Sequence, residues 1–300
     1  MDRLDAMSLL LEVIDSGSFS AAGRRLGMPL ATVSRRISDL ERHLQTRLLT
    51  RTSRKVALTE AGRSYVVACR RILESVDEAE RAAAGEYATP KGELILTAPI
   101  VFGRLHVLPV VTQFLSAYPD INIRIIFADR LVDLVDDHVD IAVRIGALPD
   151  SNLIARSIGV IRTIACASPG YLDVRGRPTV PAELTQHETI AFEGALSARD
   201  WGFQNSETHV VVSLSPRLIV NTAEAAVDAA IAGAGVTRVL SYQVADAVRA
   251  GKLEIILRPF EPAPWPVNLV HASQGLVPQK LRAFMDFAAP RLRARLDAMG

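Results

Sequence analysis

Hydrophobic residues near the start of the chain recur at helical spacing. A first helix ending at Ser16-Gly17 is predicted by apolar residues three or four positions apart: Leu4, Met7, Leu10 or Leu11, and Ile14. Ser18 is a suitable N-cap for a short second helix through Leu26, and Gly27 supplies the turn after it. The spacing predicts a third helix from about Pro29 to Leu44.

The two faces of the third helix differ in chemistry. Val33, Ile37, Leu40 and Leu44 lie within about 40° of one line on a helical wheel, so they form a core face. The opposite face is small, hydroxylated and cationic: Ala31, Arg35, Ser38 and Arg42, with Ser34 and Arg36 beside them. Small residues permit close approach and Arg reaches guanine edges or phosphates, so this face suits the major groove of DNA.

A small hairpin is predicted after the third helix. Leu48-Leu49 and Val56–Leu58 are short apolar segments that flank the polar, basic residues 50–55. Its tip would present Arg51, Arg54 and Lys55, and a wing of this kind touches phosphates or the minor groove.

Charge is concentrated in the same region. Residues 18–73 carry twelve Arg or Lys against three acidic residues, a local balance of +9, although the whole chain carries only +1. Residues 74–90 carry −4, and residues 91–300 are almost neutral. A basic stretch on a neutral protein is typical of a polyanion site, and the alternative is a solvated surface that happens to be basic.

Three sequence segments resemble the DNA-binding region of LysR-type transcription regulators over residues 1–65: GSFSAAGRRLGM, ATVSRRISDLE and LLTRTSRKVALTEAG. Pattern and resemblance together predict double-stranded DNA as a partner, contacted by Ser18, Leu30, Ala31, Thr32, Ser34, Arg35, Arg36, Ser38, Arg51, Thr52, Arg54 and Lys55. The chain departs from the family where Ser-Gln usually begins the recognition helix, because it has Pro29-Leu30. Leu30 can contact a thymine methyl group, or it can fill the core.

A long helix is predicted from Thr59 to about Tyr87. Its apolar residues step mostly by four and three: Ala61, Tyr65, Ala68, Ile72, Val76, Ala79 and Ala83. A helix roughly 43 Å long is too long for a 60-residue domain to bury, so a second copy is expected to pair with it. The resemblance implies a dimerisation linker over residues 59–88 and a homodimer or homotetramer. The alternative is packing against the chain's own second domain.

Residues 88–92 break the helix and separate a second region, in which apolar strands alternate with helices. Strands are predicted at 94–97, 121–127, 140–145, 162–167, 189–192, 210–213, 218–220, 253–257 and 267–271. Helices are predicted at 105–118, 131–137, 222–232, 242–250 and 278–292. Continuous apolar strands between helices favour a parallel sheet covered on both faces.

GELILTAPIVFG, DIAVRIG and AGAGV in this half resemble the effector-binding domain of the same family. The predicted fold is α/β: an all-α winged helix-turn-helix (1–60), a linker helix, and a two-lobed, periplasmic-binding-protein-like α/β effector domain (91–300). By the resemblance, one lobe comprises residues 91–163 and 266–300, and the other residues 164–265. The cleft between them is expected to bind a small, anionic effector.

Backbone N–H groups at strand ends and helix starts favour an anion in such a cleft. The expected effector-binding residues are Thr97, Ala98, Pro99, Arg144, Gly146, Asn221 and Thr222. Arg144 would pair with a carboxylate, or alternatively form a structural salt bridge.

Other classes of protein fit less well. No nucleotide-binding, hydrolase or zinc-protease motif is present, so an α/β enzyme is disfavoured, as is a binding protein without a DNA role. Asp133, Asp136, Asp137, His138 and Asp140 are spaced as the wet face of a short helix, so no metal or other cofactor is expected. Cys69 and Cys166 form no disulfide framework, although a redox pair is an alternative. We expect no export signal and no membrane span, and hence a cytoplasmic protein.

Overall fold

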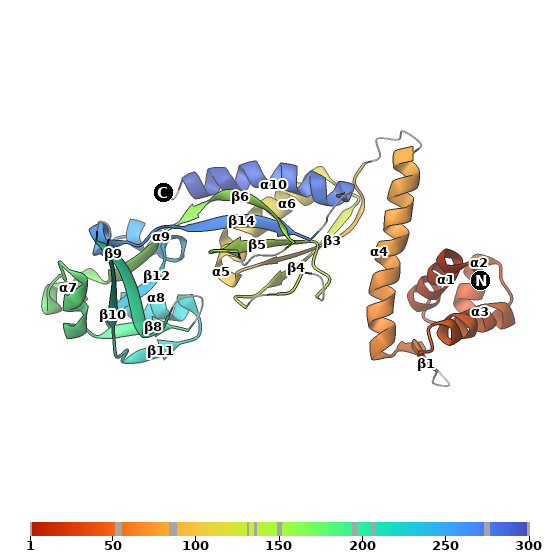
Figure 1. The fold of residues 1–300 in the computed structure, drawn as a ribbon, viewed down its shortest axis with the longest axis horizontal. Coiled ribbons are helices and arrows are strands. Elements are labelled where there is room, and N and C mark those ends of the chain that lie inside the picture. Colours follow the sequence, from red (N-terminus) through yellow and green to blue (C-terminus); the bar gives the residue numbers. More distant parts are fainter. Residues whose placement is uncertain are drawn as a thin grey trace. The chain divides into compact units, whose positions relative to one another are not determined.

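The computed structural model describes residues 2–51, 56–83, 89–130, 132–134, 137–148, 152–193, 197–205, 208–272 and 277–298. The chain separates into two compact units, Met1–Thr89 and Pro90–Gly300. Figure 1 draws the first in red to orange and the second from yellow to blue.

The first unit is helical with one small hairpin. It contains α1 (Arg3–Asp15), α2 (Phe19–Leu26), α3 (Leu30–His43), β1 (Leu49–Arg51), β2 (Val56–Leu58) and α4 (Glu60–Ala83). Strands β1 and β2 are antiparallel, with Leu49 opposite Leu58. The helix ends follow the predicted signals: the Ser18 hydroxyl accepts the Ala21 N–H at 3.1 Å, and Gly27 closes α2 at a φ of +64°.

The core of the first unit holds the predicted apolar faces together. Leu10, Val13, Val33, Ile37 and Leu40 are all buried, together with residues of β1 and α4. The Thr59 hydroxyl caps α4 by accepting the Gly62 N–H at 2.9 Å, and the Thr59 N–H donates to the Leu48 carbonyl oxygen at 3.0 Å, which joins the start of α4 to the hairpin. Gly62 must be glycine, because a Cβ there would lie 2.0 Å from the Leu48 carbonyl oxygen.

The second unit contains two five-stranded sheets, each with its own helices. The first sheet has the order β4-β3-β5-β14-β6: β3 (Gly92–Ala98), β4 (Ile121–Phe127), β5 (Ile141–Ile145), β6 (Ile154–Ile161) and β14 (Trp265–His271). Its helices are α5 (Ile100–Phe102), a π-helical turn (Gly103–Val107), α6 (Leu108–Ala117) and α10 (Gln279–Asp297). We call this part the first lobe. Figure 1 shows α6 and α10 over one face of its sheet.

The second lobe is built on the sheet β11-β8-β12-β7-β13: β7 (Thr163–Ala167), β8 (Thr189–Phe192), β11 (Leu218–Val220), β12 (Val236–Leu240) and β13 (Glu254–Ile256). It also contains a hairpin of β9 (Asp200–Asn205) and β10 (Thr208–Ser213), the helices α7 (Pro169–Arg175), α8 (Ala223–Ile231) and α9 (Ser241–Arg249), and the 3-10 turns Pro181–Gln186 and Arg258–Phe260. Alternate residues of β7 enter two separate cores, so both sheet faces are covered.

Two details of the predicted fold are wrong. The sheets are mixed rather than parallel, because β14 runs antiparallel to β5 and β6, and β7 runs antiparallel to β12 and β13. Among the described residues of 131–137, the backbone forms turns rather than the expected helix. There the Val132 carbonyl accepts a hydrogen bond from the Arg144 guanidinium, and Asp137 accepts the Asp133 N–H.

The segment Ile100–Ala117 is apolar and long enough, by composition, to cross a membrane. In this fold its apolar residues serve the first lobe's core instead, with Phe102, Val110 and Phe114 buried.

Candidate nucleic-acid interface and ligand cleft

Helix α3 separates its predicted faces as expected. Val33, Ile37 and Leu40 are buried, whereas Ala31 and Arg35 are exposed and Thr32, Ser34, Arg36 and Ser38 are half-buried. Arg42 forms an exposed ion pair with Asp39, at 2.7 Å. The face that points away from the core therefore combines small, hydroxyl-bearing and cationic side chains, which is the chemistry of a helix that enters the major groove.

The turn before α3 is tight. A Cβ on Gly23 would lie 2.7 Å from the Met28 carbonyl oxygen, so glycine allows α2 and the start of α3 to approach closely. The Ser18 hydroxyl, which was predicted to contact DNA, is engaged as the N-cap of α2. Helices α2 and α3 with this turn form a helix-turn-helix.

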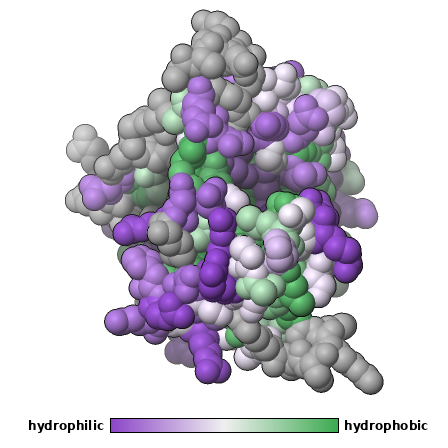
Figure 2. All heavy atoms as spheres, turned by 90° about the vertical axis from the view of Figure 1, so that its right-hand side faces the viewer, coloured by the Kyte–Doolittle hydropathy of each residue, from purple (hydrophilic) through white to green (hydrophobic). Residues whose placement is uncertain are grey.

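Leu30 does not fill the core. It is the first residue of α3, and 52% of its surface is exposed. Leu26, at the end of α2, is 45% exposed, so two leucines lie open on either side of the turn. The face drawn in Figure 2 is mainly hydrophilic, with a smaller exposed hydrophobic area between the polar side chains.

The hairpin is held against α3 by one carboxylate. Glu41 Oε1 accepts the backbone N–H groups of Leu48 and Leu49, at 2.8 and 3.0 Å. Arg51 pairs with Val56 through the β1–β2 ladder. The predicted contacts Thr52, Arg54 and Lys55, and the Arg51 side chain, lie outside the described residues.

Helix α4 uses one face for the first unit's core and leaves the row of apolar residues that is predicted to pair with a second copy, here called the seam, less covered. Val66 and Cys69 are buried against that core. In the seam, Tyr65, Ala68 and Val76 are half-buried, whereas Ile72 is 40% exposed. Arg70 pairs with Asp15 of α1 at 2.6 Å, which fixes the orientation of α4 on its own unit.

The second unit contains a cavity of about 410 Å³ between the two lobes. Residues at the carboxyl ends of β3, β5, β8 and β12 meet there, as expected for a ligand site in an open α/β sheet. Among the described residues it is lined by Pro99, Ala128, Asp129, Arg130, Val143, Arg144, Ile145, Gly146, Ala147, Phe192, Leu240, Tyr242, Gln243 and Trp265. We call this cavity the cleft.

Three of the seven predicted effector residues, Pro99, Arg144 and Gly146, line the cleft. Thr97 and Ala98 are buried instead, and the Thr97 hydroxyl donates to the Ile126 carbonyl oxygen at 2.9 Å. Asn221 and Thr222 are exposed but are not among the lining residues, and the Thr222 hydroxyl caps α8 by accepting the Ala225 N–H. Thr97 and Ala98 are the last two residues of β3 and are packed within the sheet, so only Pro99, which follows the strand, reaches the cleft.

Three further lining residues, Arg130, Tyr242 and Trp265, were not predicted from the sequence. Trp265 opens β14, and its ring lies 3.1 Å from where a Cβ of Gly146 would stand, so Gly146 makes room for it. Arg130 and Arg144 bring two positive charges, whereas the Asp129 carboxylate accepts the Ile100 N–H at 3.0 Å. The excess of guanidinium groups favours an anionic ligand.

Burial shapes the charges at this site. Burial lowers the pKa of Arg144, and the nearby Asp133 opposes that shift. Burial also raises the pKa of Tyr242, with a further contribution from Asp129, so its hydroxyl stays protonated and able to donate. Gln243 fixes the start of α9, because its Oε1 accepts the Leu240 N–H at 2.9 Å.

No metal site and no disulfide occur in the part of the chain that the structure describes. Its His, Cys, Asp and Glu side chains form no group of three that could hold a metal ion. Cys69 and Cys166 are both free thiols and both buried. Burial raises the pKa of the Cys166 thiol to about 12.

Comparison with known proteins identifies the family. Residues 4–63 match the model of the bacterial regulatory helix-turn-helix protein of the lysR family, and residues 88–293 match the LysR substrate binding domain. The chain belongs to the LysR-type transcriptional regulators. It therefore pairs a helix-turn-helix that binds DNA with an effector-binding domain, as the sequence predicted.

Relatives of this LysR-type regulator span nearly its whole length. An HTH-type transcriptional regulator from Xanthomonas campestris is 34% identical over 97% of this chain and 86% of its own. A transcriptional repressor from Pseudomonas aeruginosa is 34% identical, over 96% of this chain and 91% of its own. The transcriptional activator AaeR from Escherichia coli is 31% identical, over 95% and 93%.

Solved structures of full-length regulators are similar as well. CrgA from Neisseria meningitidis is 30% identical, with a TM-score of 0.62 over 96% of this chain and 98% of its own. The virulence activator AphB from Vibrio cholerae is also 30% identical, with a TM-score of 0.61 over 95% and 98%.

Proposed function

We propose that this LysR-type regulator binds a specific operator as a homodimer or homotetramer and that a small anionic metabolite in the cleft changes that binding. The observation that carries the proposal is the exposed face of α3, where Arg35 lies among small and hydroxyl-bearing side chains on a helix-turn-helix. The protein is proposed to work in the cytoplasm and to catalyse no reaction.

At the DNA, α3 is proposed to lie in the major groove. Ala31 and Arg35 would face the bases, with Leu30, Thr32, Ser34, Arg36 and Ser38 beside them, while Ser18 fixes the start of α2. Arg51, Thr52, Arg54 and Lys55 of the wing would contact phosphates or the minor groove. Glu41 supports simultaneous binding of α3 and the wing to DNA, because its carboxylate holds the wing against the end of α3.

At the cleft, the carboxylate of a metabolite is proposed to bind between Arg144 and Arg130, with its apolar part against Tyr242 and Trp265. Pro99 and Gly146 would shape the wall beside it. Thr97 and Ala98 act only by positioning Pro99. Asn221 and Thr222, which are exposed at the start of α8, are proposed as further contacts of the metabolite.

A thermal-shift screen of the full chain against metabolite carboxylates and their uncharged amides tests the cleft. A ligand that binds only the folded protein raises its melting temperature, and at a hundred times its Kd it adds about 2.7 kcal/mol of stability. We expect carboxylates but not amides to act, and Arg144→Gln to abolish the shift. A shift that survives Arg144→Gln would place the effector elsewhere.

The α4 seam supports the oligomer. Ile72 is a large apolar side chain left 40% exposed on a helix whose other face is already packed. Pairing with a second copy would remove it from water. Light scattering of the intact chain at micromolar concentration should find at least a dimer, and Ile72→Glu should shift the distribution toward monomer. A monomeric wild-type protein would contradict the proposal.

A further inference from the structure

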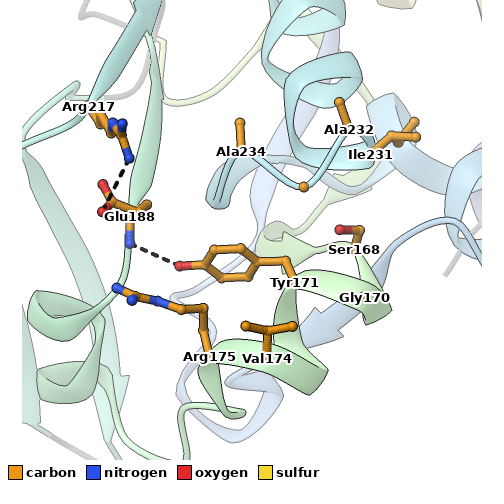
Figure 3. Close-up of a pocket in the computed structure, with 11 residues that line it drawn as sticks. Ser168, Gly170, Tyr171, Val174, Arg175, Glu188, Arg217, Ile231, Ala232 and Ala234 are labelled. Atoms are coloured by element: carbon orange, nitrogen blue, oxygen red, sulfur yellow. Dashed lines mark hydrogen bonds and ion pairs between the residues drawn. The ribbon is translucent and has the colours of Figure 1, made fainter.

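A second cavity lies in the second lobe, at the edge of the sheet opposite the cleft (Figure 3). It is a pocket that opens widely to solvent, with a volume of about 650 Å³. Strand β8 runs from this cavity, where Glu188 precedes it, to the cleft, where Phe192 ends it. The two cavities therefore lie at opposite ends of the same strand, and a ligand in one does not occupy the other.

The mouth of this pocket is cationic. Arg217 Nη1 lies 3.6 Å from Glu188 Oε1, in an ion pair whose Arg side chain is 76% exposed. Arg175 donates to the Gln186 carbonyl oxygen at 3.3 Å. Figure 3 shows both guanidinium groups on the same side of the pocket, with Glu188 and the Tyr171 hydroxyl between them. Two guanidinium groups face one carboxylate, so the pocket mouth carries an excess of positive charge. Because an exposed ion pair is weak, an incoming anion can bind to both guanidinium groups.

The rest of the pocket is apolar. Val174 is 82% exposed, the most exposed of the large hydrophobic side chains in the described structure. Ile231 at the end of α8 is half-buried and faces the same space. The Tyr171 ring forms a fixed wall, because its hydroxyl accepts the Glu188 N–H at 2.9 Å and lies 3.3 Å from His187 Nδ1. An exposed apolar surface next to paired cations suits a ligand with both characters.

The end of α8 does not repel an anion as strongly as an open helix end would. Two of its last carbonyl groups are bonded: the Gly233 N–H donates to the Ala230 carbonyl at 3.1 Å, and the Ala234 N–H to the Ala229 carbonyl at 3.0 Å. Their partial negative charge is therefore satisfied within the chain.

We propose that this pocket is a second small-molecule site that binds a monocarboxylate with a compact apolar body. The carboxylate lies between Arg175 and Arg217, and the apolar body lies against Val174, Tyr171 and Ile231. The guanidinium groups recognise the charge, and the side chains of α7 and α8 select the shape.

Methyl NMR of the full chain, labelled at Val and Ile methyl groups, tests this site. The probes are phenylacetate and 4-methylpentanoate, each with its uncharged amide. We expect the carboxylates to shift the Val174 and Ile231 signals at concentrations up to about 10 mM, with the amides binding at least about tenfold more weakly. Arg249→Ala, on another exposed arginine of the same lobe, should leave the shifts unchanged.

Two variants make the test decisive. Arg175→Ala combined with Arg217→Ala should abolish the shifts of both signals, and Val174→Glu should separately abolish the shift of the Ile231 signal by placing a carboxylate in the pocket. All three side chains are exposed, so the melting temperature should stay near that of the wild type. Shifts that persist in both variants, amides that bind as well as the acids, or no shift with either acid would each overturn the proposal.

Discussion

Tyr242 packs edge to face against Phe102, with their ring centroids 5.3 Å apart. Tyr242 lies near the start of α9 in the second lobe and lines the cleft, whereas Phe102 ends α5 in the first lobe. His106, in the π-helical turn, completes the cluster at 5.8 Å from Tyr242. A wall of the cleft is therefore also a contact between the lobes. A ligand that binds against Tyr242 can thereby favour one arrangement of the two lobes over another.

Removal of the Tyr242 ring should weaken the second unit. Tyr242→Ala removes the ring that Phe102 and His106 both pack against, and a buried aromatic side chain of this size contributes about 3 kcal/mol. Tyr242→Phe is the matched control, because it keeps the ring and removes only the hydroxyl. Thermal unfolding should show a much lower melting temperature for the alanine variant alone. Equal melting temperatures for all three proteins would contradict the role of this contact.

His106 should make stability depend on pH. Burial, reinforced by Arg295, lowers its pKa from 6.5 to about 4. As the pH falls below 6.5 the unfolded chain binds a proton that the folded chain does not bind until near pH 4, so stability is lost across that interval. Relative to His106→Phe, the wild type should lose about 2 kcal/mol between pH 7 and pH 5. Unfolding curves that run parallel for the two proteins would show that His106 is not the titrating group.

The wing arginines should act on all DNA sequences alike. Arg51→Ala and Arg54→Ala each remove one proposed phosphate contact, so binding should weaken uniformly and the slope of log affinity against log salt should fall by about one. Arg249→Ala, in the second lobe, is the control and should change neither quantity. The measurement is a salt titration with specific and scrambled duplexes. A loss confined to one sequence would assign these residues to base reading instead.

Leu30 should read thymine methyl groups. It is exposed at the first turn of α3, where a leucine has no hydrogen bond to offer a base. Replacing thymine by uracil, one position at a time, in a bound duplex should weaken wild-type binding at one position. The loss should disappear in Leu30→Ala and in Leu30→Gln. Tight binding with no effect of uracil would reject this role and leave the DNA-binding claim intact.

Features set by local sequence were predictable, and features set by distant contacts were not. The helix-turn-helix followed from the periodicity of Val33, Ile37 and Leu40 and from a cap at Ser18, all of which are local signals. Strand β6 was missed because its burial follows no simple alternation, and its antiparallel partner β14 begins about a hundred residues later. A periodic pattern contains no information about such pairing.

The cleft was predicted only in part for the same reason. Pro99 and Gly146 were found because they follow strands at a sheet edge, which the order of elements already indicated. Tyr242 and Trp265 come from α9 and β14, and only the return of the chain to the first lobe brings Trp265 beside Gly146. Thr97 lies two residues before the cleft-lining Pro99, inside β3, where its hydroxyl donates to the Ile126 carbonyl of the neighbouring strand instead.

Helix α3 should read a specific DNA sequence through Arg35. The most direct test compares the affinity of the full chain for genomic fragments that it retains with its affinity for scrambled duplexes at physiological salt. Specific binding should be at least about 10³-fold tighter, and Arg35→Ala should reduce that ratio by about tenfold or more while weakening binding to scrambled DNA far less. Equal affinity of the wild-type protein for retained and scrambled DNA would show that α3 does not read a specific sequence.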